Sequence, residues 1–382
     1  MIRLIEQKID SGVAIDRAEA AWLFSSATDL DLSRLASTVR ARFHAPDDAS
    51  WLVMAIVNYT NVCVAKCDYC SFFRLPHDKD GYLLTFDQVA AKIDQLIAYG
   101  GTLVAFNGGF HPKLRIDDYA ELFRNVRERH YGSRLEFFEM TVAEFMFSCK
   151  VSKVTYEQGA KILAASGTRW ITGGGAEILD DGFRSRHSPG KYTVADYFSA
   201  QRAILEQGIG TTATMVIGFD ETLDERLNHL EALRSFQTSC DDGLTSFLCW
   251  TYKPWNNALG GTEISTAEYL RWLAVCRIYL HNIRHIRTSV LTKNESALLG
   301  LRYGANDFDL PVEDEVTERA GATISRDFEK ILEHAKSLGF KPRHREPFQP
   351  ANSTKEIEPI SARDVSFGTS SMNTTGGETT HA

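Results

Sequence analysis

The sequence predicts an α/β fold, specifically a (β/α)8 barrel of the TIM type. Two observations support this prediction. Eight short β-rich runs alternate with amphipathic helical segments, and together they span roughly 250 residues, the usual length of such a barrel. Strands separated by helices are expected to be parallel, with right-handed crossovers. The alternative, a doubly wound open sheet, would carry Gly-x-Gly-x-x-Gly after its first strand, where this chain has cysteines.

The predicted elements follow one another along the chain. Residues 1–50 are predicted to form a helical extension, with turn or cap signals at Asp10-Ser11-Gly12 and Asp29-Leu30-Asp31. The predicted strands are Val53–Asn58, Thr102–Asn107, Leu135–Met140, Arg169–Thr172, Thr211–Gly218, Thr245–Tyr252, His285–Leu291 and, weakly, Asn306–Leu310. The predicted helices are Thr85–Tyr99, Ile116–His130, Thr155–Ser166, Val194–Gln207, Leu223–Thr238 and Thr266–Asn282.

These elements define the expected domains. The barrel should occupy residues 51–312, and a helical segment should occupy residues 313–348. Residues 349–382 are polar and small, so they cannot bury enough apolar surface to offset their ordering entropy. We therefore expect that tail to be disordered.

Composition and charge exclude some partners. The chain is 43% hydrophobic and 24% charged, as in a globular protein with a sizeable core. Its net charge of −8 offers no basic patch for nucleic acid. No apolar stretch is long enough for a membrane span, and the N-terminus resembles an amphipathic helix rather than a secretory signal. We expect a cytoplasmic protein.

Three cysteines carry the most informative motif. Cys63, Cys67 and Cys70 lie within eight residues, directly after the first predicted strand. Three thiolates can hold three irons of a cubane iron–sulfur cluster and leave the fourth iron open for a substrate. A zinc site is an alternative, with His77 as a possible fourth ligand. Disulfides are disfavoured, because the chain has seven cysteines, an odd count.

Other conspicuous residues come at the ends of the predicted strands, where a TIM barrel places its chemistry. Gly108 and Gly109 allow a ligand to approach the backbone closely after the second strand. Glu177 follows three glycines, and a carboxylate so placed could bind ribose hydroxyls or accept a proton. A solvated loop acid is the alternative for Glu177. Lys253 and Lys293 could bind a substrate carboxylate or could be surface charges.

Several of these motifs together resemble the menaquinone and deazaflavin branch of the radical S-adenosylmethionine (radical SAM) enzymes. The motifs are Asn58-Tyr59-Thr60-Asn61-Val62-Cys63, Gly108-Gly109-Phe110-His111-Pro112, Gly173–Leu179, Thr211–Met215 and Leu301–Asp307. This resemblance implies a [4Fe–4S] cluster on Cys63, Cys67 and Cys70, with SAM bound at its open iron. It also implies SAM-binding roles for Tyr69, Asn107, Gly108, Gly109, Glu177, Met215, Ile217 and Gly218, with Val216 in the same wall of the fifth strand.

The resemblance is greatest to the dehypoxanthine futalosine cyclases of menaquinone biosynthesis. It implies that a 5′-deoxyadenosyl radical abstracts the ribose C4′ hydrogen of a nucleoside-type small molecule, and that the C4′ radical then adds to an aromatic ring. An electron donor such as flavodoxin or ferredoxin is implied as a partner. Substrate contacts are expected from Asn61, Phe138, Phe219, Lys253, Lys293 and Asp307.

Departures from the family pattern leave two further hypotheses. Phe219 stands where the family usually has His, and Phe138 lies where relatives commonly show a His. These changes favour a paralogue, such as an aminofutalosine-synthase-like or deazaflavin-synthase-like enzyme, that forms a carbon–carbon bond on another nucleoside or aromatic substrate. A non-catalytic iron–sulfur or zinc protein that uses the same cysteines is the third hypothesis.

Overall fold

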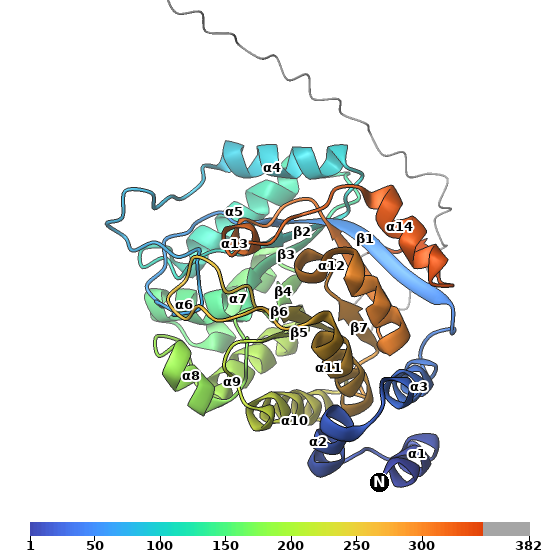
Figure 1. The fold of residues 1–382 in the computed structure, drawn as a ribbon. Coiled ribbons are helices and arrows are strands. Elements are labelled where there is room, and N and C mark those ends of the chain that lie inside the picture. The colour runs from blue at the N-terminus through green and yellow to red at the C-terminus, as the bar shows by residue number, and fades with distance from the viewer. Residues whose placement is uncertain (347–382) are drawn as a thin grey trace, which may run out of the picture.

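Eight parallel strands close into a barrel in the computed structural model, which describes residues 1–346 (Figure 1). Neighbouring strands follow chain order, and β1 closes the ring by pairing with both β8 and β2. The strands of the ring are β1 Asp48–Val57, β2 Leu103–Phe106, β3 Glu136–Thr141, β4 Trp170–Thr172, β5 Gly210–Ile217, β6 Leu244–Thr251, β7 His285–Thr288 and β8 Asp307–Pro311. The predicted (β/α)8 barrel is confirmed, including its weak last strand.

A ninth strand, β9 Lys341–His344, was not predicted. It lies parallel to the first half of β1, with Asp48 opposite Lys341, while the second half of β1 pairs with β2. The segment predicted to be helical over 313–348 thus contains two helices and a strand. The tail predicted to be disordered, 349–382, lies outside the described residues.

Helices surround the barrel, and most begin where the sequence supplies a cap. Thr85, Thr155 and Thr222 each accept a backbone hydrogen bond three residues on, and a Gln or Glu at that position returns one. The helices after β1 are α4 Phe86–Ala98, α5 Ile116–Arg129, α6 Val142–Ser152, α7 Tyr156–Ser166, α8 Asp181–His187, α9 Val194–Glu206, α10 Leu223–Ser239, α11 Thr266–Tyr279, α12 Val290–Lys293, the 3-10 helix η1 Asn294–Tyr303, α13 Glu315–Arg319 and α14 Phe328–Ser337.

The N-terminal extension consists of α1 Ile2–Asp10, α2 Arg17–Ser26 and α3 Asp29–Arg40. These helices pack beside α10 and α11 (Figure 1). Arg271 of α11 holds them there, because its guanidinium donates to the carbonyls of Phe24 and Ala27 and pairs with Asp29 at 2.6 Å. Within residues 1–346, no helix combines the length and apolar character that crossing a membrane requires.

The core has two layers. The larger layer lies between the strands and the outer helices and includes Met215 and Ile217 of β5. A smaller cluster, which includes Met54, Leu103 and Phe138, lies inside the barrel. Because both faces of a barrel strand are buried, apolar residues occur at successive positions instead of alternating with polar ones. The space left above the inner cluster forms the site described next.

Candidate active site

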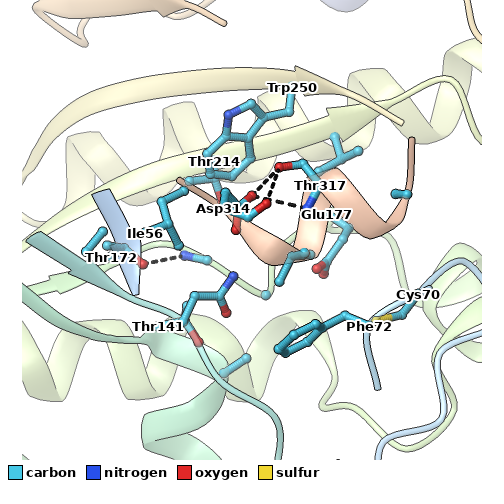
Figure 2. A pocket seen from close by; sticks show the side chains of 18 of the residues that line it. Ile56, Cys70, Phe72, Thr141, Thr172, Glu177, Thr214, Trp250, Asp314 and Thr317 are labelled. Atoms are coloured by element: carbon cyan, nitrogen blue, oxygen red, sulfur yellow. Dashed lines mark hydrogen bonds between the residues drawn. The ribbon is translucent and has the colours of Figure 1, made fainter. Parts of the chain in front are cut away.

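A cavity of about 280 Å³ occupies the barrel interior at the carboxyl ends of the strands. Its wall is mostly apolar, and α13 contributes part of it (Figure 2). The structure brings eleven of the predicted site residues to this wall: Cys63, Cys67, Tyr69, Cys70, Asn107, Gly108, Gly109, Phe138, Glu177, Phe219 and Lys253. Residues that are distant in the sequence therefore share one enclosed space.

The cysteine loop is fixed by backbone hydrogen bonds. The Cys63 amide donates to the Arg74 carbonyl at 2.8 Å, and the Cys70 amide donates to the Cys67 carbonyl at 3.2 Å. Between them, Lys66 adopts a positive φ of 54°, a conformation that costs a non-glycine residue energy. The surrounding contacts thus hold all three sulfurs at the cavity wall.

The three thiols suit metal ligation. Burial raises the pKa of each, and raises that of Cys67 to about 12. Such thiols are not free thiolates at neutral pH, whereas binding to iron would deprotonate them.

Within residues 1–346, no three His, Cys, Asp or Glu side chains converge as the ligands of a single metal ion do. His77, the possible fourth zinc ligand, is 80% exposed beside Asp78. Each cysteine of a cubane cluster binds a different iron, so the donor set fits a cluster.

The Gly108–Gly109 loop packs directly against the cysteine loop. A Cβ on Gly109 would lie 2.4 Å from the Val62 carbonyl oxygen and 2.7 Å from Cys63 Cβ. A Cβ on Gly108 would lie 2.6 Å from the Tyr59 ring. Only glycine therefore fits at either position, and the exposed backbone next to the cysteines is suited to a small polar ligand.

Glu144 holds the Gly108–Gly109 loop in place, a role that the sequence did not indicate. Its carboxylate accepts hydrogen bonds from the Gly108 amide at 2.8 Å, from the Thr141 amide and hydroxyl, and from the Tyr59 hydroxyl. Burial raises the pKa of Glu144 to about 7, although these hydrogen bonds act in the opposite direction. Glu144 ties β3 and α6 to the loop after β2.

Glu177 forms an ion pair with Lys191 inside the cavity. Lys191 Nζ lies 2.8 Å from Glu177 Oε2 and 5.7 Å from the centre of the Tyr69 ring. Burial alone would lower the pKa of Lys191, but Glu177 and Cys67 outweigh it and raise that pKa. Glu177 has a positive φ of 41°, a strained conformation of the kind that clusters at functional sites. Lys191 was missed because it lies in a loop with no motif around it.

Of the four residues predicted to form the β5 wall, Val216 lines the cavity, whereas Met215, Ile217 and Gly218 do not. Thr212, Thr214 and Val216 line the cavity, whereas Met215 and Ile217 belong to the outer core. Successive side chains of a strand point to opposite faces, so the two sets cannot share a side. Gly218, also predicted to bind SAM, ends the strand with a φ of 97° and is not a lining residue.

Three predicted substrate residues make structural contacts instead of lining the cavity. The Asn61 side chain bonds to the backbone of Asp80 and Tyr82. Lys293 donates to Glu263 and to the Ile264 carbonyl. Asp307 is the first residue of β8, so it lies at the amino end of the barrel, where Arg345 pairs with it at 2.6 Å.

Aromatic side chains form another part of the cavity wall. Phe219 lies 5.0 Å from Tyr69 and 4.6 Å from Tyr252, measured between ring centres. Phe138 lies 5.3 Å from Trp170 in the same way. These contacts give an organic substrate an apolar surface.

The polar groups on the remaining wall come from β7, β8 and α13. Arg287 pairs with Asp309, and both line the cavity. Asp314 lies next to α13 and accepts hydrogen bonds from Thr317 (Figure 2). None of these residues forms a local motif, so sequence reasoning did not find them.

Comparison with known proteins agrees with this geometry. Residues 57–233 match the model of the radical SAM superfamily, and residues 241–357 match the CofH/MqnC C-terminal region. The chain is 33% identical to the cyclic dehypoxanthine futalosine synthase of Halalkalibacterium halodurans, over 89% of this chain and 92% of the relative. The chain belongs to the radical SAM superfamily.

Two further comparisons support the same family and the same fold. The aminodeoxyfutalosine synthase of Thermus thermophilus is 31% identical, over 83% of this chain and 86% of the relative. The crystal structure of methylornithine synthase shares the fold, with a TM-score of 0.68 at 16% identity, over 88% of this chain and 97% of that one. The chain is thus a radical SAM enzyme of the CofH/MqnC branch, and its cofactors are a [4Fe–4S] cluster and SAM.

Proposed function

We propose that this enzyme forms a carbon–carbon bond in cyclising dehypoxanthine futalosine to cyclic dehypoxanthine futalosine, a step of menaquinone biosynthesis. One observation carries the proposal most directly. A single apolar cavity extends from the three cluster thiols to Phe138, Phe219 and the polar groups near α13. The cofactor and an organic substrate would therefore share one enclosed space. The identity to a synthase of that name over nearly the whole chain supports the choice of substrate.

Roles for the chain's own residues follow from their positions. Cys63, Cys67 and Cys70 would hold the cluster, which together with SAM supplies a 5′-deoxyadenosyl radical when both are bound. Asn107, Gly108 and Gly109 would bind the methionyl part of SAM, and Tyr69 would lie beside the adenine. Glu177, fixed by Lys191, would bind the ribose hydroxyls of SAM.

The proposed reaction removes two hydrogens from the substrate and joins two of its carbons. The C4′ hydrogen leaves as an atom and completes 5′-deoxyadenosine. The C4′ radical then bonds to the aromatic ring, and the ring hydrogen is lost as a proton together with one electron, for which the oxidised cluster would be the acceptor. Phe138 and Phe219 would hold the ring against C4′ and exclude water, so that the radical meets only its intended partner.

The expected cellular compartment and electron donor follow from the same proposal. We expect a cytoplasmic enzyme, because the cluster needs a reducing compartment, and a reduced flavodoxin or ferredoxin as its electron donor. The predicted lack of a nucleic-acid partner rests on the net charge of −8.

The test is anaerobic reconstitution with iron and sulfide, followed by incubation with SAM, dithionite and dehypoxanthine futalosine. We expect 5′-deoxyadenosine together with a product two hydrogen atoms lighter than the substrate. Cleavage of SAM without that product would reject this substrate. Absence of cleavage, with several candidate substrates present, would reject a radical SAM activity altogether.

A second candidate is favoured by the two phenylalanines. Phe138 and Phe219 line the cavity at positions where the family commonly has His, so this part of the wall lacks the polar group expected there. A sibling enzyme acting on another nucleoside or aromatic substrate would account for the change. Substrates of the aminodeoxyfutalosine synthase and deazaflavin reactions, assayed in parallel, would distinguish the two.

A further inference from the structure

Asp314 differs from the other acidic residues of the cavity wall. Three carboxylates line the cavity, those of Glu177, Asp309 and Asp314. Glu177 pairs with Lys191, and Asp309 pairs with Arg287. Asp314 has no cation within ion-pair distance in the described part of the chain, although the residue is only 3% exposed.

One oxygen of Asp314 lacks a hydrogen-bond partner among the described residues. Thr317 donates both its hydroxyl and its backbone amide to Oδ2. Oδ1 is buried and has no hydrogen-bond partner within residues 1–346. The Asn58 amide donates one of its two N–H groups to the Asn107 carbonyl at 2.9 Å, and it lies close enough to Asp314 to lower the pKa of that carboxyl. A buried acceptor without a donor is costly, so the site calls for a hydrogen-bond donor from a bound molecule.

The charge state of Asp314 fits such an acceptor. Burial raises its pKa to about 6, while Thr317 and Asn58 act in the opposite direction. Most Asp314 side chains are therefore ionised at neutral pH. Bonds to ionised acceptors are stronger than those between neutral groups.

Position and substrate chemistry together identify the donor. Asp314 and Thr317 lie on one side of the cavity, whereas Cys70 and Phe72 lie on the other (Figure 2). A substrate that fills the cavity between these two sides would lie against the wall to which Asp314 belongs. The aromatic ring of dehypoxanthine futalosine carries no hydrogen-bond donor, whereas its ribose carries hydroxyls.

We propose that Asp314 Oδ1 accepts a hydrogen bond from a ribose hydroxyl of the substrate, and so helps to select that substrate. This inference rests on the proposed function. It gives the segment after β8, from Asp314 to Ala320, a substrate-binding role in addition to its place in the cavity wall.

The test uses Asp314→Asn in the reconstituted holoenzyme. Asparagine also caps helices well, so the variant should keep Thr317 and α13 in place. Its amide nitrogen, a hydrogen-bond donor, would however take the place of the acceptor Oδ1. The matched control is Asp327→Asn, which changes the cap of α14 outside the cavity. We expect the KM for dehypoxanthine futalosine to rise at least tenfold in Asp314→Asn alone, with SAM affinity unchanged.

Substrate analogues identify the contact. The 2′-deoxy and 3′-deoxy forms of dehypoxanthine futalosine are each titrated into the wild type and Asp314→Asn. We expect one analogue to bind the wild type at least tenfold more weakly than the parent, while Asp314→Asn no longer distinguishes the two. If the variant discriminates against both analogues as the wild type does, or loses kcat at an unchanged KM, the inference is overturned and the proposed function stands. A wild type that neither binds nor converts dehypoxanthine futalosine overturns both.

Discussion

The two sides of the cavity are built in different ways. The cofactor side consists of glycines, backbone groups and three cysteines that lie in short continuous segments between Cys63 and Glu177. The substrate side consists of side chains from β3, β7, β8 and the segment around α13, which are far apart in the sequence. Under the proposed assignment, the SAM-binding residues lie in short local segments, whereas the substrate-binding residues come together only when the barrel assembles. Substitutions on the cofactor side should impair formation of the 5′-deoxyadenosyl radical. Substitutions on the substrate side should leave radical formation intact but lower the share of radicals that lead to product.

The largest effect is expected from Cys67→Ala. Loss of one thiolate should abolish both the cluster and SAM cleavage, because the iron it holds has no replacement ligand. Iron content and 5′-deoxyadenosine formation measure this. Cys240→Ala, which changes a half-buried thiol outside the cavity wall, is the matched control and should keep both. A full iron complement with normal cleavage in Cys67→Ala would contradict the assignment of the motif.

Glu177→Gln should separate cluster assembly from turnover. The variant should keep its iron but lose about 10- to 100-fold in kcat/KM for SAM, the scale of a lost hydrogen bond to a charged group. Because Lys191 acts on Glu177, adding Lys191→Met should cost less than the sum of the two single effects. Loss of the cluster in Glu177→Gln would show that this carboxylate lies against the iron site instead of the SAM ribose.

Gly109→Ala should weaken SAM binding by about tenfold, because the added methyl meets the Val62 carbonyl and overpacking commonly costs 1–3 kcal/mol. Equilibrium binding of SAM to the reconstituted enzyme is the measurement. Gly12→Ala is the control: its positive φ of 73° strains the backbone there, but Gly12 does not line the cavity and a Cβ meets nothing within 4 Å, so SAM affinity should not change. Unchanged SAM affinity in Gly109→Ala would remove this loop from the SAM site.

Phe138→Leu tests the substrate side with a smaller change. Phe138 lines the cavity and packs on Trp170, away from the cysteine loop. We expect SAM affinity to be retained and the ratio of cyclic product to 5′-deoxyadenosine to fall by about threefold, since a looser wall holds the ring less well. An equal loss of SAM affinity would mean that the two sides are not separable.

The last prediction concerns the stability of the fold and its dependence on the buried carboxyl group of Glu144. The pKa of Glu144 in the folded state, about 7, lies above its ordinary value of 4.5. The folded state therefore holds the proton more tightly, so stability relative to Glu144→Gln should decrease from pH 4.5 to 7 by about 2–3 kcal/mol. Urea unfolding of both proteins across this range measures it. A relative stability that rises with pH would show that the four donors around the carboxylate outweigh its burial.

The same comparison explains what could be predicted from sequence. The barrel, the cysteines and the Gly108–Gly109 loop were predictable, because alternation and short motifs are local signals. The orientation of β5 was not, since both faces of a barrel strand are apolar and Met215 cannot be told from Val216 by pattern. Successive side chains of a strand face opposite sides, so the predicted wall combined residues of both faces.

Long-range contacts account for the other differences. Strand β9 forms only because β1 extends far enough to pair with it. Asp307 has a structural role because Arg345 pairs with it. Arg345 directly follows β9 in the chain. Lys191 and Asp314 reach the cavity from segments without a motif, so no signal within a short window identifies them.

The most direct test of the central claim is the fate of the C4′ hydrogen. The reconstituted enzyme would be incubated with SAM, a reductant and dehypoxanthine futalosine carrying deuterium at C4′, and the 5′-deoxyadenosine would be analysed by mass spectrometry. We expect 5′-deoxyadenosine that carries one deuterium and a cyclic product that carries none at that position. Unlabelled 5′-deoxyadenosine, formed while the product appears, would contradict it.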